Sequence, residues 1–418
     1  MCMEKKNVLE IVEEKELNFV LSSKIREDVP QCFQLNDVAV FVHLYYEDSI
    51  EQYLAYVKNI PVGINVFISV SSEGMKRKLE NYLQKWNLQN CRIIMKQNRG
   101  RDLSALLVAF REKVCQYKYI CFVHDKKEKY EKLSDDTQMW IRSMWDNTLL
   151  SEAFIYNVLD LLVKNKSVGL LVPPEMAGKR LNHAYVDTWE ANYENTVDLA
   201  KKLKLDCNIS INYPSVTLGT VFWCKSAALE KLLAKDWKYE DFHEEPLPWD
   251  GTISHAIERV LGYVAQDAGF ETGYIMSDMF AQSYILQLKN TLRTTYVNLK
   301  EWGINSFRDL AQQKYLKKNL VPFMEKFQRV YFYGAGYFGE KCFRIAEEGN
   351  RKPHGFLVSK RERGQEFLGL PVYELNEIDF NENLGIVVAV GERYEGEIVN
   401  LLDKMGVTNY MTINSFTE

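Results

Sequence analysis

The sequence predicts an α/β protein built on open, largely parallel sheets. Short apolar runs alternate with segments of helical spacing from residue 37 onward, and the same alternation begins afresh at residue 328. The run 38–42 is apolar at every position, as expected for a strand that is covered on both faces. Strands that alternate with helices of about 10–15 residues pair in parallel, so each stretch of alternation predicts an α/β domain.

The length of 418 residues suggests two or three domains, because a domain takes about 100–200 residues. A net charge of −5 argues against a nucleic-acid partner, which normally requires a basic surface. The eight cysteines show neither the spacing of a zinc site nor a compact disulfide array. No apolar stretch approaches the roughly 20 residues of a membrane-spanning helix. We therefore expect a cytoplasmic protein with reduced thiols.

The predicted domains follow in order along the chain. Residues 1–36 are charged and weakly periodic, and we expect a leader there. A first domain is expected over 37–283, a polar helical connector over 284–327, and a smaller domain over 328–418. In the first domain the predicted strands are 38–42, 64–69, 92–95, 119–123, 168–172 and 216–224, and the predicted helices are 50–57, 75–86, 103–114 and 251–264.

The smaller domain opens with a glycine-rich turn. Gly334, Gly336 and Gly339 follow the predicted strand 330–333 and begin a helix, which is the context of the dinucleotide-binding fingerprint. That fingerprint also requires an acidic residue about 20 positions further on, after the second strand. The strand 355–358 is followed instead by Ser-Lys-Arg. We therefore expect a Rossmann-like domain without an NAD site, whose glycines allow close packing or the approach of a phosphate.

Ligands of open α/β sheets bind outside the carboxyl ends of the strands, so the residues after each apolar run are the candidates for a site. After the third predicted strand the chain reads Asn98-Arg99-Gly100-Arg101-Asp102. One interpretation is a turn in which Gly100 takes an unusual backbone angle and Asp102 caps the next helix. The other is a nucleotide site, since arginine suits a diphosphate and a carboxylate can bind ribose hydroxyls.

After the fourth predicted strand come His124, Asp125 and Lys126. A carboxylate at a strand end can hold Mg²⁺ or Mn²⁺ against substrate phosphates, which makes Asp125 the candidate metal ligand. Only one carboxylate is present, however, and Lys126 could itself neutralise phosphate charge. The alternative is a strand-to-loop turn followed by a solvated run of charges.

A third group of charged residues precedes and enters the last predicted helix of the first domain. If that helix starts at Gly251, Asp250 is its N-cap and His255 lies on its first turns. The functional alternative makes a carboxylate the general base for an acceptor hydroxyl, with Asp250 the first candidate and Glu245 the second. The chain contains no Gly-x-Ser-x-Gly and no P-loop sequence, which removes the simplest hydrolase and P-loop interpretations.

Six blocks of this sequence, taken together, resemble the rhamnan synthesis F family of bacterial polysaccharide glycosyltransferases over about 37–283. Their order and spacing make the resemblance more specific than any single block. The blocks are Val40-Phe-Val-His-Leu-Tyr-Tyr46, Asn98-x-Gly-Arg-Asp102, Phe122-Val-His-Asp-Lys126, Gly169-Leu-Leu-Val-Pro-Pro174, Gly219-Thr-Val-Phe-Trp223 and Asp250-Gly-Thr-x-x-His255-Ala-x-Glu258-Arg259.

The resemblance implies a GT-A-like nucleotide-sugar domain. It also implies transfer of a sugar, rhamnose or a similar hexose or deoxyhexose, from a nucleoside-diphosphate donor to a growing surface polysaccharide of the cell wall or capsule. The acceptor would be a glycan or a lipid-linked glycan. The protein would then work at the inner face of the cell membrane or with an assembly complex.

On this resemblance each candidate receives a role. Asp250 would be the catalytic base, with Glu245 second, and His255 would orient or contact the acceptor. Mg²⁺ or Mn²⁺ would bind, if at all, at Asp125. The donor would be held by Asn98, Arg99, Gly100, Arg101, Asp102, His124, Asp125 and Lys126.

Two other classes of function stay open. The lack of a complete Asp-x-Asp motif favours a non-catalytic binding or scaffold subunit of a glycan-assembly complex. The glycine-rich turn, taken at face value, indicates an NAD-linked sugar oxidoreductase or epimerase. Turnover of a bound nucleotide-sugar would exclude the scaffold, and a nicotinamide signal would support the oxidoreductase.

Overall fold

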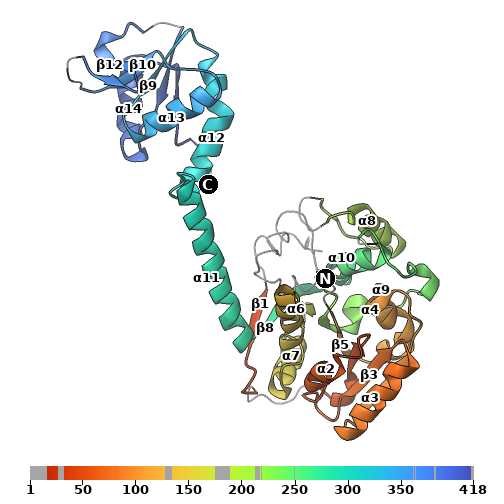
Figure 1. Ribbon diagram of the computed structural model, residues 1–418. Helices are drawn as coiled ribbons and strands as arrows, with labels where there is room; N and C mark the ends of the chain where they lie inside the picture. Colours follow the sequence, from red (N-terminus) through yellow and green to blue (C-terminus); the bar gives the residue numbers. More distant parts are fainter. Residues whose placement is uncertain are drawn as a thin grey trace. The chain divides into compact units, whose positions relative to one another are not determined.

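The computed structural model forms two compact units, Met1–Asn290 and Thr291–Glu418. Each unit is built on its own sheet flanked by helices, which confirms the predicted α/β class with a second, smaller domain (Figure 1). The structure describes residues 17–26, 33–127, 134–174, 189–211, 217, 219–248, 250–360, 362, 364–380 and 383–415.

The first unit holds an eight-stranded sheet in the order β1-β8-β6-β7-β5-β2-β3-β4. Every neighbouring pair is parallel except those of β7, which runs antiparallel to β5 and β6. The strands are β1 (Asn18–Leu21), β2 (Val38–His43), β3 (Asn65–Val70), β4 (Cys91–Met95), β5 (Tyr119–His124), β6 (Val168–Val172), β7 (Phe222–Lys225) and β8 (Glu271–Ser277).

Helices connect most of these strands. Within the described residues, no helix is both long and apolar enough to cross a membrane. The helices are α2 (Ile50–Val57), α3 (Glu73–Lys85), α4 (Arg101–Ser104), α5 (Arg111–Val114), α6 (Ser134–Asp146), α7 (Glu152–Lys164), α8 (Tyr193–Lys202), α9 (Glu230–Leu233), α10 (Ile253–Asp267) and α11 (Asp278–Glu301), with a π-helical turn at Ala105–Ala109.

Part of the expected leader belongs to the sheet. The strand β1 lies at the sheet edge and pairs in parallel with β8. The ring of Phe19 packs where Gly273 of β8 has no side chain, since a Cβ there would lie 2.8 Å from Cε2 of Phe19. Residues 1–16 and 27–32, the rest of the expected leader, lie outside the described residues. So does Val216, at which the predicted strand 216–224 begins.

Both predicted aspartate caps are wrong. The helix α4 begins at Arg101, and its N-cap is Gly100 with a φ of 73°, so Asp102 lies in the first turn. The helix α10 begins at Ile253 with Thr252 as its N-cap, so Asp250 lies outside the helix. Both aspartate side chains are therefore available for other contacts.

The first sheet is covered on both faces. Ala39 and Phe41 of β2 belong to one buried core, and the alternate residues Val40 and Val42 belong to the other. This alternation explains why the strand is apolar at every position.

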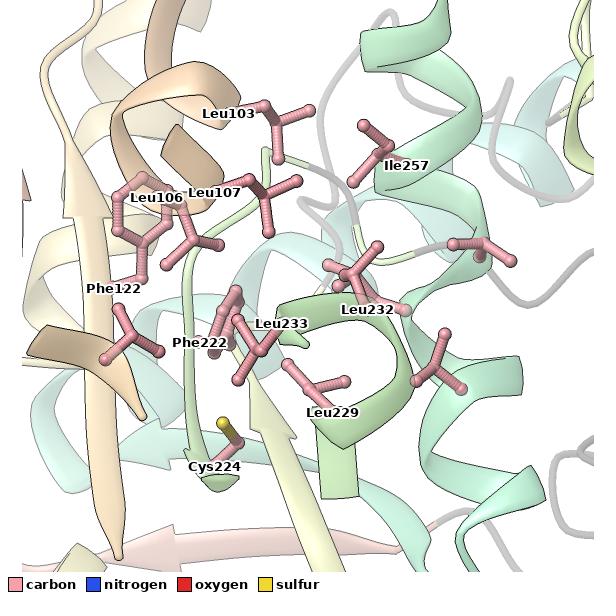
Figure 2. Close-up of a cluster of buried hydrophobic side chains, with 14 of the residues drawn as sticks. Leu103, Leu106, Leu107, Phe122, Phe222, Cys224, Leu229, Leu232, Leu233 and Ile257 are labelled. Carbon is pink, nitrogen blue, oxygen red and sulfur yellow. The ribbon is translucent and has the colours of Figure 1, made fainter. Parts of the chain in front are cut away.

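One of these cores anchors two segments that carry predicted site residues. Leu103 and Leu107 follow the 98–102 loop, and Ile257 lies on α10. Figure 2 shows their side chains gathered with Phe122 and Phe222. The 98–102 loop and the start of α10 are therefore fixed against the same part of the sheet.

The second unit has a six-stranded sheet in the order β11-β12-β10-β9-β13-β14. All its pairs are parallel except β11 with β12. Its elements are α12 (Phe307–Met324), β9 (Arg329–Tyr333), α13 (Tyr337–Glu348), β10 (Gly355–Val358), β11 (Glu366–Phe367), β12 (Leu370–Glu374), β13 (Leu384–Val388), α14 (Glu392–Lys404) and β14 (Tyr410–Thr412).

Two glycines of the fingerprint are required by packing. A Cβ on Gly334, whose φ is 123°, would lie 2.3 Å from the carbonyl oxygen of Ala389. A Cβ on Gly339 would lie 2.0 Å from the carbonyl oxygen of Gly334, so α13 could not approach the end of β9. Gly336 meets no such atom within 4 Å. The packing interpretation thus accounts for two of the three glycines.

Candidate functional site

The carboxyl ends of β2, β4 and β5 lie at one edge of the first sheet, because these strands run parallel. The N–H of Asp125 donates to the carbonyl of His43 at 3.0 Å, which ties the end of β5 to the end of β2. His124 Nε2 lies 3.8 Å from a carboxylate oxygen of Asp102. The structure therefore brings the 98–102 and 124–126 segments together.

Gly100 and Arg99 hold the 98–102 loop against Phe242. A Cβ on Gly100 would lie 2.5 Å from Cγ of Phe242, so only glycine lets the loop rest on that ring. Arg99 Nε donates to the carbonyl of Phe242 at 2.7 Å, and its Nη1 lies 3.1 Å from a carboxylate oxygen of Glu244. Asn98 is exposed.

Arg101 lies opposite the second base candidate. Its Nε is 3.2 Å from Oε1 of Glu245, and about half of its side chain is exposed, at 51%. Its φ is 47°, a region that residues other than glycine rarely occupy. Glu245 Oε2 also accepts the N–H of Leu247 at 3.1 Å. The loop therefore presents Arg101 beside Glu245 at the surface of the site.

His124 is held between two carbonyl groups. Its Nε2 lies 2.6 Å from the carbonyl oxygen of Gly219, and its Nδ1 lies 2.9 Å from that of Asp125. Each ring nitrogen faces a backbone carbonyl oxygen, which fixes the ring of His124 at the end of β5 beside Asp102.

Asp125 turns its carboxylate back toward the end of β2. Oδ2 accepts the N–H groups of Tyr45 at 2.7 Å and Tyr46 at 2.8 Å. The residue is buried, with 6% of its surface exposed. Burial raises the pKa of Asp125 to about 6, outweighing the two hydrogen bonds, which lower it. Its carboxylate therefore connects two strand ends at an energetic cost.

Lys126 is held by two aromatic residues. Its Nζ lies 2.8 Å from the ring centre of Trp140. The hydroxyl of Tyr53 accepts the N–H of Lys126 at 3.1 Å and donates to its carbonyl at 2.9 Å. Trp140 also borders Gly219, because a Cβ there would lie 3.1 Å from its Nε1. The ammonium group is thus fixed near the carbonyl that contacts His124.

The third group of charged residues that the sequence singles out reaches this edge of the sheet through α10. Glu258 accepts the N–H of Gly219, the residue whose carbonyl faces His124. Burial is the largest cause of the lowered pKa of His255, and the charge of Arg101 adds to it, so α10 also lies within electrostatic reach of the 98–102 loop. All three predicted segments therefore meet at this edge.

Asp250 and His255 have partners outside the 98–102 and 124–126 segments. Asp250 accepts the N–H of Ala191 at 2.9 Å and the side-chain amide of Asn192 at 2.6 Å. Burial alone would raise the pKa of Asp250. The hydrogen bonds that the carboxylate accepts lower the pKa by more, so the net shift is downward. His255 Nδ1 accepts the N–H of Thr252 at 3.3 Å and lies 3.6 Å from Asp250. Burial is the main cause of the lowered pKa of His255.

Comparison with known proteins identifies the family. Residues 5–270 match the family model described as rhamnan synthesis protein F. The chain belongs to this family. None of the curated proteins compared with it matches.

Among solved structures, this member of the rhamnan synthesis protein F family is similar to the mannosyltransferase PcManGT from Pyrobaculum calidifontis in complex with GDP-Man and Mn²⁺, at 11% sequence identity and a TM-score of 0.37. The match covers 65% of this chain and 63% of that mannosyltransferase, which is less than two thirds of its length.

The family member carries two buried basic residues at the site that the sequence interpretation missed. Lys96 follows β4 directly, and burial lowers its pKa to about 8, while Asp102 and Glu245 oppose that shift. His43 ends β2, its Nδ1 lies 2.9 Å from the hydroxyl of Ser69, and burial lowers its pKa well below the usual value. Both residues lie at the carboxyl end of a strand, where ligands of open α/β sheets bind. This strand-end rule, applied to every strand, would have found them.

Among the described residues, the oxygen atoms at this edge do not form a site for a resident divalent cation. Such a cation prefers several oxygen ligands, including one or two carboxylates. Asp125, the predicted ligand, already uses Oδ2 on two N–H groups. Across the described ranges, no group of three or more His, Cys, Asp or Glu side chains is placed to hold a metal ion.

Proposed function

We propose that the protein is a glycosyltransferase that moves a sugar from a nucleoside-diphosphate donor to a growing bacterial surface polysaccharide. Membership of the rhamnan synthesis protein F family supports a glycosyltransferase role. The sugar would be rhamnose or a similar hexose or deoxyhexose, and the acceptor a glycan or lipid-linked glycan at the cytoplasmic face of the membrane. The observation that carries the proposal is the meeting of the two strand-end loops, with His124 3.8 Å from Asp102.

The reaction sets two chemical requirements. The acceptor oxygen forms a bond to the anomeric carbon, and the bond from that carbon to the diphosphate oxygen breaks with its electron pair. The acceptor proton passes to a base, and the charge that develops on the leaving diphosphate must be neutralised. A competent site therefore needs a carboxylate on the acceptor side and positive charge on the donor side.

The residues present supply both kinds of group. Arg101 and Lys126 offer positive charge for the diphosphate, His124 lies beside them at the end of β5, and Asp102 offers a carboxylate for ribose hydroxyls. Asp250 remains our first candidate for the base and Glu245 our second. The hydrogen bonds to Asp250 keep it ionised but make it a weaker proton acceptor, so the assignment depends on a kinetic test.

A thermal-shift screen of nucleoside-diphosphate sugars on the full chain tests the donor site. A ligand present at about 100 times its Kd stabilises a protein by about 2.7 kcal/mol, so the matching donor should stand out. Asp102→Asn should abolish the shift. The matched control is Asp198→Asn on α8, whose exposed carboxylate lies 3.3 Å from Lys201. A screen in which no nucleotide-sugar shifts the transition would refute the donor assignment.

Release of nucleoside diphosphate in the presence of an acceptor glycan distinguishes an enzyme from a binding subunit. A catalytic protein should release it continuously, whereas a scaffold would give the thermal shift without turnover. An NAD-linked function has less support, because Gly334 and Gly339 are accounted for by packing.

A further inference from the structure

We propose that the donor diphosphate is held by cationic side chains of this chain, chiefly Lys126 and Arg101, without a divalent metal ion. The inference rests on the proposed function and specifies how the donor site works. Its first support is that three described carboxylates at this edge face basic side chains or N–H groups. Asp125 accepts two N–H groups, Glu245 pairs with Arg101, and Asp102 lies 3.8 Å from His124.

The second support is the position of Lys126. The residue directly after Asp125 is a cation, at the strand end where a second carboxylate would complete a metal site. Tyr53 fixes its backbone through two hydrogen bonds, and the face of Trp140 lies 2.8 Å from its Nζ. A fixed ammonium group neutralises phosphate charge without the reorganisation that a mobile side chain would need.

The third support is the contact that Arg101 makes with Glu245. Arg101 contacts Glu245 through its Nε atom, which is its ion pair within the described part of the chain. Half of its side chain is exposed. Both Nη groups therefore remain for a phosphate, which arginine binds in a bidentate manner. The buried ammonium group of Lys96 lies within electrostatic reach of Asp102 and Glu245, so it adds positive charge on this side of the site.

Calorimetry on the full-length protein tests this directly. GDP, UDP and dTDP serve as probes, each titrated in excess EDTA and again with Mg²⁺ or Mn²⁺. We expect one of them to bind in EDTA with an affinity that the metal does not measurably improve. Lys126→Gln should weaken that binding by about tenfold or more, the loss expected for one charged hydrogen bond. Lys126→Arg should retain part of it.

The matched control is the adjacent lysine. Lys127 is half exposed and pairs with Asp48, so Lys127→Gln should bind the same nucleotide as wild type does. Thermal unfolding of each variant confirms that it is folded before its affinity is compared.

Two results would overturn the inference in different ways. Binding that requires Mg²⁺ or Mn²⁺ would refute the metal-free site and leave the proposed function intact. Failure of every probe in both conditions, for the wild-type protein, would refute the donor site itself. Direct titration with Mn²⁺ alone provides an independent readout, and we expect no binding at micromolar concentration.

Discussion

Replacing Asp125 by asparagine should make the protein more stable at neutral pH. Asparagine keeps an oxygen that can accept the N–H groups of Tyr45 and Tyr46, now 2.7 and 2.8 Å from Oδ2, and it carries no charge. The pKa of Asp125 rises from an ordinary 3.8 to about 6, mainly because the carboxylate is buried. A rise of this size corresponds to a cost of roughly 3 kcal/mol for ionisation in the folded protein.

The sign of the pH dependence follows from the direction of that shift. Between about pH 4 and pH 6 the folded state binds more protons at Asp125 than the unfolded state does, so stability falls as the pH rises. The asparagine variant avoids this loss. Its advantage should be about 3 kcal/mol at pH 7.5, about half of that at pH 5, and small at pH 4.

Urea denaturation of both proteins at pH 7.5 and pH 5 measures the difference. The control is Asp198→Asn, an exposed carboxylate whose replacement should change stability by less than about 0.5 kcal/mol. If Asp125→Asn is less stable than wild type at pH 7.5, the hydrogen bonds outweigh the cost of burial and the reasoning fails. If it is more stable by the same amount at both pH values, the gain has another origin.

Three further outcomes are expected. Donor affinity, measured by calorimetry, should fall as the pH rises through 8, where Lys96 loses its proton, and Lys96→Gln should bind weakly with no such fall. Asp250→Asn should reduce transfer by roughly 10²–10⁴ in a nucleotide-release assay, whereas a near-normal rate would pass the role of base to Glu245. Gly339→Ala should destabilise the second unit in urea denaturation, because its Cβ would lie 2.0 Å from a backbone oxygen. Gly396→Ala, on α14 with no atom within 4 Å, should leave stability unchanged or raise it by up to about 1 kcal/mol.

Two strands whose side chains are all buried are predicted closely from the sequence. β2 and β6 start where predicted, because a strand covered on both faces must be apolar at every position. β1 was missed, because its four residues lie in a charged context and join the sheet only by pairing with β8. That pairing sets Phe19 opposite Ile275, 256 positions later in the sequence. A pairing between segments so far apart leaves no pattern in the local sequence from which it could be predicted.

The same limit explains what was missed at the site. The strand-end rule singled out the 98–102 and 124–126 loops as candidates, because parallel strands present their carboxyl ends at the same edge of a sheet. It could not show that Gly219 contacts His124 across 95 residues, or that Asn192 contacts Asp250 across 58. The cap assignments failed because they depend on backbone angles, such as the φ of 73° at Gly100, rather than on residue type alone.

These long-range contacts indicate that the carboxylates and the cations of the site have different roles. Asp125 joins β5 to the segment after β2, and Asp250 joins the start of α10 to the segment before α8. Each carboxylate accepts two hydrogen bonds from another segment and so fixes the loops in place. Arg101 and Lys126 instead extend from these fixed loops with groups suited to an anion. A site whose loops are already tied together by carboxylates does not need a metal ion to organise it. Removal of either tie should therefore weaken donor binding even where the cations are unchanged.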